Sequence, residues 1–165
     1  MSRPKLQPEG QFPPASLVRR FAAIFYDFML CTALTVVVTW IYQQGILRLI
    51  YGGPQLKLMS DSGALDQDPI LSSLVLLSLF AFFAKFWTLK GQTLGMQVWN
   101  IRVQNPDGSR ISLIQALLRF VIAIFSWLAL GLGFWWQLWS KNKATWHDTY
   151  SETVTVQLPK GVHKK

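Results

Sequence analysis

Long apolar stretches alternate with polar segments along this chain, and their lengths predict helices that cross a membrane. Phe21 to Ile41 carries a single charged residue, Asp27, and Ile70 to Ala84 carries none. Each stretch approaches the roughly 20 residues that a helix needs to cross ~30 Å of hydrocarbon. We therefore predict two transmembrane helices, over residues 17–42 and 69–89.

A third apolar stretch, residues 113–140, is interrupted by Arg119 and by Gly131-Leu132-Gly133. A straight helix would cross once and place the basic C-terminal residues outside, against the tendency of Lys and Arg to stay in the cytoplasm. A break at the glycines leaves a return arm of about 11 Å at 1.5 Å per residue, which is too short to cross. We favour a bent or re-entrant helical hairpin, and a simple third span is the alternative.

The polar segments predict smaller elements. Residues 1–16 hold four prolines and few apolar side chains, which predicts a disordered cytoplasmic tail. Residues 97–112 combine β-prone residues with the turn Asn105-Pro106-Asp107-Gly108 and predict a β-hairpin. The alternation at 152–158 predicts a strand that can join this hairpin, and residues 159–165 form a basic tail. The expected fold is an all-α membrane protein with a small cytoplasmic β-hairpin or three-stranded sheet.

Composition and charge support a membrane protein and indicate its orientation. The chain is 51% hydrophobic, with a mean hydropathy of +0.27, and it contains 8 Trp and 11 Phe. Its 16 Lys and Arg against 8 Asp and Glu give a net charge of +8. Basic residues beside apolar helices are typical of cytoplasmic segments at a lipid bilayer with anionic headgroups. We expect the cell inner membrane, both termini in the cytoplasm and, because no nucleic-acid motif is present, no nucleic-acid partner.

Asp27 is costly inside a membrane helix. At 100° per residue it shares one helix face with Arg20, about 10 Å away along the axis. A charged side chain at the bilayer centre costs roughly 2.5–3.5 kcal/mol on insertion scales, so Asp27 should face protein and find a partner. We favour Arg119 as that partner, over Lys85 and Arg20. A structural ion pair, an ion or proton site, and the lining of a wet cytoplasmic cleft remain open as roles.

Residues for other chemistry are few. His147 and Asp148 follow the last helix, but the chain has only two His and one Cys, so a structural cap is favoured over a metal or acid–base site. No P-loop, dinucleotide fingerprint or catalytic Ser or Cys set is present. We therefore expect no enzyme, no cofactor and no metal.

Four sequence blocks resemble those of the RDD family, small bacterial membrane proteins named for one Arg and two Asp. The blocks are RRFAAIFYD at 19–27, FWTLKGQTLGMQVWNIRV at 86–103, ALLR at 116–119 and WHDTYSETVTV at 146–156. The resemblance extends over about residues 17–156 and implies that Arg20, Asp27 and Asp148 are the residues of the name. A single membrane domain is expected over 17–158.

The resemblance implies transport as an expectation, because transport of unidentified ligands has been suggested for the family and some members are linked to sodium–proton exchange. The chain departs from the family pattern at Leu94, where Pro is usual, and at Met96, where Lys is usual. The first hypothesis is transport of an ion or small ligand through a charged centre of Arg20, Asp27, Arg119 and Asp148. The predicted helices are too few to enclose a pathway in a single chain, so a homo-oligomer or a larger membrane partner is expected. The alternative is a non-transporting membrane adaptor or assembly partner.

Overall fold

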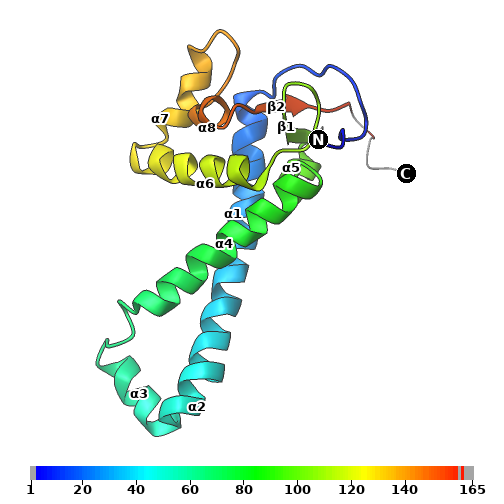
Figure 1. Cartoon of the computed structure of the whole chain (residues 1–165). Coiled ribbons are helices and arrows are strands. Elements are labelled where there is room, and N and C mark those ends of the chain that lie inside the picture. The colour runs from blue at the N-terminus through cyan, green and yellow to red at the C-terminus, as the bar shows by residue number, and fades with distance from the viewer. Residues whose placement is uncertain (1–2, 160, 162–165) are drawn as a thin grey trace. The chain divides into compact units, whose positions relative to one another are not determined.

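The computed structural model describes residues 3–159 and 161, and the chain forms two compact units. Unit 1 comprises the chain up to Phe28 and from Phe82 onward, and unit 2 comprises Met29–Ala81. Most of the chain is helical (Figure 1). In chain order the elements are α1 (Leu17–Trp40), the π-helix η1 (Ile41–Leu47), α2 (Arg48–Tyr51), α3 (Gly53–Asp61), α4 (Pro69–Leu89), α5 (Leu94–Val98), β1 (Ile101–Gln104), α6 (Leu113–Leu128), α7 (Leu132–Trp135), the 3₁₀ helix η2 (Trp136–Leu138), α8 (Trp146–Tyr150) and β2 (Val154–Gln157).

Two helical stretches are long and apolar enough to cross a membrane, Leu17–Tyr51 and Pro69–Leu89. The second coincides with the predicted helix 69–89. The first is longer than the helix predicted over 17–42, because α1 continues through η1 and α2 without a break. It ends at Gly52, whose φ of +78° is outside the helical region. Few side chains of either stretch are buried in the isolated chain, as is expected of helices that face lipid.

The third apolar stretch is bent, as predicted. The α6 helix and the segment Leu132–Leu138 meet at an angle of 109°. The bend comes from Leu130 and Gly131, whose φ values are +54° and +78°, a conformation that glycine adopts readily. The Gly131 N–H donates to the carbonyl of Ser126 at 2.7 Å and so closes the end of α6. Gly133 keeps the two arms close, because a Cβ there would lie 2.3 Å from Ser126 Oγ.

β1 and β2 form a two-stranded antiparallel sheet in which Ile101 lies opposite Gln157 and Gln104 opposite Val154. The strand predicted at 152–158 is therefore confirmed, but the sheet differs from the hairpin predicted over 97–112. The first part of that range belongs to α5, because Thr93 accepts a hydrogen bond from the first turn and caps a helix there. The last part leads directly into α6, which begins with a capping box.

The described residues 3–16 of the N-terminal tail follow a defined path, which corrects the disordered segment predicted over 1–16. The tail pairs with the outer edge of β2: the Ala15 N–H donates to the Thr155 carbonyl and the Gln157 N–H to the Pro13 carbonyl, both at 2.9 Å. Prolines are tolerated there because an edge segment needs few N–H donors. Most of the basic tail predicted over 159–165 lies outside the described residues.

Unit 2 has a small core of its own at the turn between its helices. Its buried and half-buried members are Tyr42, Leu47, Leu56, Leu65 and Leu71. The Tyr42 hydroxyl donates to the Asp68 carboxylate at 2.7 Å, and Asp68 also accepts the backbone N–H of Ile70 at 2.8 Å. Asp68 therefore caps α4 and joins it to the end of the first helical stretch.

Candidate functional site

Three charged residues from distant parts of the sequence meet inside unit 1. Arg20 lies in the first turn of α1, Arg119 in the middle of α6 and Asp148 in α8. None of the three is more than 5% exposed. Charged side chains are rarely buried to this extent unless they are paired. We call these three residues the Arg–Asp–Arg cluster.

Asp148 joins the two arginines through its two carboxylate oxygens. Arg20 Nη1 donates to Oδ2 at 2.6 Å, and Arg119 Nη1 donates to Oδ1 at 2.7 Å. The hydroxyl of Thr155 also donates to Oδ1, at 2.8 Å. Such charge-assisted bonds are shorter and stronger than bonds between neutral groups. The carboxylate therefore ties α1, α6, α8 and β2 together.

Hydroxyl groups complete the hydrogen bonds of the cluster. Thr145 caps α8 and forms a capping box with Asp148, three residues further on. Thr145 Oγ1 also lies 3.4 Å from Arg20 Nη1, and Arg119 donates to Thr153 Oγ1. Because Asp148 is both a member of the capping box and the ion-pair partner, the short helix α8 is held with its carboxylate between the two arginines.

Burial and the two guanidinium groups set the pKa values of the residues in α8. Burial by itself raises the pKa of Asp148, but the charges of Arg20 and Arg119 outweigh it and hold this pKa well below its ordinary value. Burial, together with the charge of Arg119, lowers the pKa of His147 to about 3. His147 is therefore neutral at physiological pH, and its ring packs 4.9 Å from that of Phe134.

Asp27 lies in a second polar site with different partners. Thr93 Oγ1 donates to its Oδ2 at 2.5 Å and the Gly95 N–H donates to its Oδ1 at 2.9 Å. Only glycine fits at position 95, because a Cβ there would lie 2.4 Å from the Ala23 carbonyl oxygen and 2.9 Å from Asp27 Oδ1. Within the described part of the chain, no Lys or Arg is within ion-pair distance of Asp27. The buried carboxylate is therefore held by two neutral donors.

The ion pair predicted between Asp27 and Arg119 is not formed. Arg119 pairs with Asp148 instead, because α8 brings that carboxylate next to α6, while the start of α5 supplies the donors to Asp27. Lys85, the second candidate partner, is exposed and forms no ion pair among the residues described. Of the charged centre predicted from Arg20, Asp27, Arg119 and Asp148, three residues lie together, whereas Asp27 has partners of its own.

Several residues of these sites were not predicted. Thr145 carries a sequence signal, since it stands three residues before Asp148 in the spacing of a capping box. Thr93 and Gly95 carry no comparable signal, because their role depends on the approach of α5 to α1. Across residues 3–159 and 161, no three His, Cys, Asp or Glu side chains gather in a group that could hold a metal ion.

A comparison with models of protein families identifies the family of this chain. The model of the RDD family matches residues 14–152, a range that contains both polar sites. The chain belongs to the RDD family. No curated protein and no solved structure matches it. In this RDD protein, the residues that resemble the Arg and the second Asp of the family name, Arg20 and Asp148, are direct partners, while Asp27 has a separate site.

Proposed function

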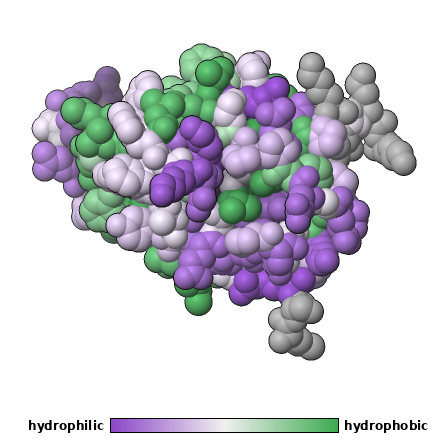
Figure 2. Space-filling model, turned by 90° about the horizontal axis from the view of Figure 1, so that it is seen from above, coloured by the Kyte–Doolittle hydropathy of each residue, from purple (hydrophilic) through white to green (hydrophobic). Residues whose placement is uncertain are grey.

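We propose that this RDD protein resides in the cell inner membrane with both termini in the cytoplasm. The N-terminal tail, β1 and β2 are hydrogen-bonded to one another, which supports placing all three on one side of the bilayer. Two crossings, by Leu17–Tyr51 and Pro69–Leu89, return the chain to that side before β1, and the bent α6–α7 segment returns it again before β2. Figure 2 looks onto this part of unit 1 from above and shows hydrophilic residues over much of the surface. Its many basic residues favour the cytoplasmic side.

The function that the geometry supports best is transport of a cation or proton, with Asp27 as the binding group. The observation that carries this proposal is a carboxylate that is buried within a membrane-spanning helix and has no cationic partner among the described residues. Ionisable residues in such positions are often part of ion or proton pathways. Thr93 and Gly95 orient the two oxygens and leave lone pairs that can take a proton or a cation. Two spans and a bent helix pair do not enclose a pathway, so the proposal includes a homo-oligomer or a larger membrane partner.

Flux measurements on proteoliposomes test this function. The purified protein should dissipate an imposed proton or sodium gradient, and Asp27→Asn should abolish this flux while the protein stays folded. Thr93→Val removes a donor to Asp27 and should reduce the flux, whereas Thr93→Ser should preserve it. Asp66→Asn removes an exposed carboxylate and serves as the matched control. Unchanged flux in Asp27→Asn would exclude Asp27 as the binding group.

A non-transporting membrane adaptor or assembly partner is the second candidate. The Arg–Asp–Arg cluster favours it, because its carboxylate is fully used in holding four elements together. An adaptor would show no flux in liposomes, Asp27→Asn would chiefly lower its abundance, and a larger membrane protein would copurify with it at constant ratio. Neither function involves catalysis by the chain.

A further inference from the structure

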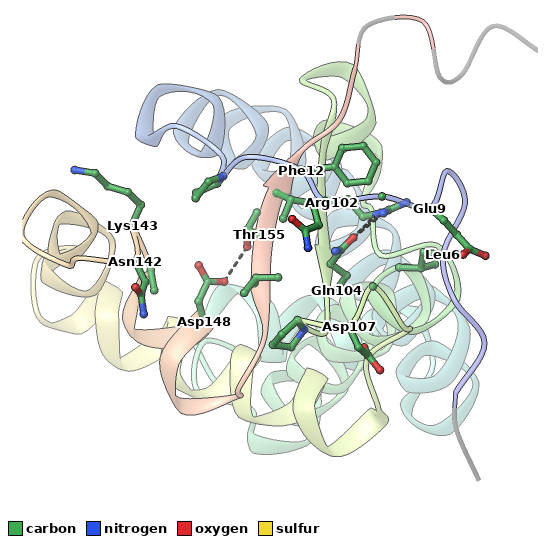
Figure 3. Close-up of a pocket in the computed structure, with 18 of the residues that line it drawn as sticks. Leu6, Glu9, Phe12, Arg102, Gln104, Asp107, Asn142, Lys143, Asp148 and Thr155 are labelled. Atoms are coloured by element: carbon green, nitrogen blue, oxygen red, sulfur yellow. Dashed lines mark hydrogen bonds between the residues drawn. The ribbon is translucent and has the colours of Figure 1, made fainter.

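A cavity of about 560 Å³ lies in unit 1 between the N-terminal tail, the sheet and the loop before α8. This volume is within the range of small-molecule sites, roughly 300–1,000 Å³. Figure 3 shows Arg102 and Gln104 of β1 at the cavity, with Phe12 of the tail beside Arg102 and Lys143 on the opposite side. The cavity shares Arg20 and Asp148 with the Arg–Asp–Arg cluster but does not include Asp27.

Arg102 is a buried cation on the wall of this cavity, and the described residues that hold it are neutral. Its side chain is 1% exposed. Nε and Nη2 donate to Gln104 Oε1 at 2.9 and 2.6 Å, and the fork also donates to the carbonyls of Gln7 at 2.9 Å and Pro8 at 3.2 Å. The ring centroid of Phe12 lies 5.3 Å from the guanidinium carbon. Buried charges normally have a partner of opposite sign, and Arg102 has none among the residues described.

The other charges around the cavity leave a positive excess. The charged lining residues are four cations and three anions: Lys5, Arg20, Arg102, Lys143, Glu9, Asp107 and Asp148. Two ion pairs account for four of them. The remaining three are Arg102, Lys143 and Asp107, and the last accepts the backbone N–H of Ser109 at 2.9 Å. The paired carboxylate of the cluster is also shared with Arg119, which adds a further positive charge close by.

We propose that this cavity binds a small anion carrying a phosphate or carboxylate group, with Arg102 as its anchor and Lys143 at its rim. The guanidinium fork matches the oxygens of either group. The carbonyl oxygens of Gln7 and Pro8 fill that fork in the absence of ligand, and the oxygens of the anion take their place. Gln104 keeps Nε oriented in both states. The site is independent of Asp27 and of the proposed transport.

Isothermal titration of the full chain in phosphatidylcholine nanodiscs tests this site. Inorganic phosphate and acetate are the probes, and chloride at equal ionic strength is the background. Saturable binding is expected for the unmodified chain. Arg102→Gln should weaken it by about 30-fold or more, since it removes a buried charge from a charge-assisted contact. Arg102→Lys keeps the charge but not the guanidinium fork, and its loss of affinity should be intermediate.

A pair of exposed lysines provides the matched control. Lys143→Ala, at the rim, should weaken binding a few-fold, whereas Lys141→Ala removes an exposed charge that does not line the cavity and should leave affinity unchanged. The two lysine variants still test the anion site if Arg102→Gln does not fold, which circular dichroism and size-exclusion chromatography would reveal. Absence of saturable binding to the unmodified chain, or an equal loss in both lysine variants, overturns the proposal.

The same titration separates two sources of the bound group. In nanodiscs that contain phosphatidylglycerol, loss of phosphate binding identifies a lipid headgroup as the occupant, and unchanged affinity identifies a soluble anion. Asp27→Asn leaves the cavity intact. If that variant still binds the anion although its flux is abolished, the anion site and the transport site function independently.

Discussion

Asp148 is the single acidic residue between two buried guanidinium groups, and its removal leaves both charges without compensation. Breaking a buried ion pair by removing one partner costs about 3–5 kcal/mol. We therefore expect Asp148→Asn to lower the unfolding midpoint sharply, as measured by thermal denaturation in detergent. Asp107→Asn, which changes an exposed carboxylate, should leave the midpoint nearly unchanged. Equal midpoints for the two variants would show that the cluster contributes nothing to stability.

His147 should make the stability of the protein depend on pH. Its pKa is lowered to about 3 in the folded chain, whereas an unfolded His titrates near 6.5. As the pH falls below 6.5, the unfolded chain takes up a proton that the folded chain does not, so stability decreases over this window. We expect the unfolding midpoint to drop between pH 7.5 and 5, and His147→Gln to flatten that drop.

The pH window also separates the effect of His147 from that of its neighbour Asp148. The pKa of Asp148 is depressed in the folded chain. Its contribution to the free energy of unfolding is therefore fully present above the pKa of an unfolded Asp, ~3.9, and is lost only as the pH falls further. Between pH 7.5 and 5 the effect of His147 is therefore measured without a contribution from Asp148. A pH profile as steep in His147→Gln as in the unmodified chain would contradict its assignment as a buried neutral residue.

Among the elements, those with a continuous local pattern were predicted and those that depend on distant contacts were not. The apolar run of α4 and the glycine break after α6 mark their elements within a few residues of sequence. The tail is different: its prolines suggest disorder, yet its path follows from hydrogen bonds to β2, about 140 residues away. The partner of Asp27 was missed for the same reason, because residues 93–95 approach α1 only in the folded chain.

The contact between α5 and α1 should tolerate no side chain at position 95. Gly95→Ala places a Cβ 2.4 Å from the Ala23 carbonyl oxygen, so α5 must shift and its bonds to Asp27 must lengthen. We expect a loss of about 1–3 kcal/mol, typical of overpacking, together with reduced flux. Gly45→Ala is the control, since nothing lies within 4 Å of a Cβ there. Equal unfolding midpoints for both variants would contradict the close approach.

At the scale of the whole molecule, the pairing of the sheet with the tail limits which segments can lie on opposite sides of the membrane. Strand β2 pairs with β1 and with the tail, so a third full crossing between β1 and β2 would separate segments that are hydrogen-bonded to one another. The 109° bend of the third apolar stretch removes that conflict. Hydropathy alone leaves both arrangements open, because α6 is apolar enough for either. The pairing of β1 with β2 favours a bent segment that returns to the side on which it began. This topology can be measured directly.

Labelling of single cysteines with a membrane-impermeant maleimide measures this topology. In a Cys31→Ser background, Lys5→Cys and Lys141→Cys introduce thiols at exposed positions of unit 1, and Ser62→Cys introduces one at an exposed position of unit 2. The first two should react in inside-out vesicles, because the proposed topology places the tail and the segment after η2 on the cytoplasmic side. Ser62→Cys should react in right-side-out vesicles and serves as the control for vesicle orientation. Reaction of Lys141→Cys from the outside would establish a third span, and the pairing of β1 with β2 could not then exist in the membrane.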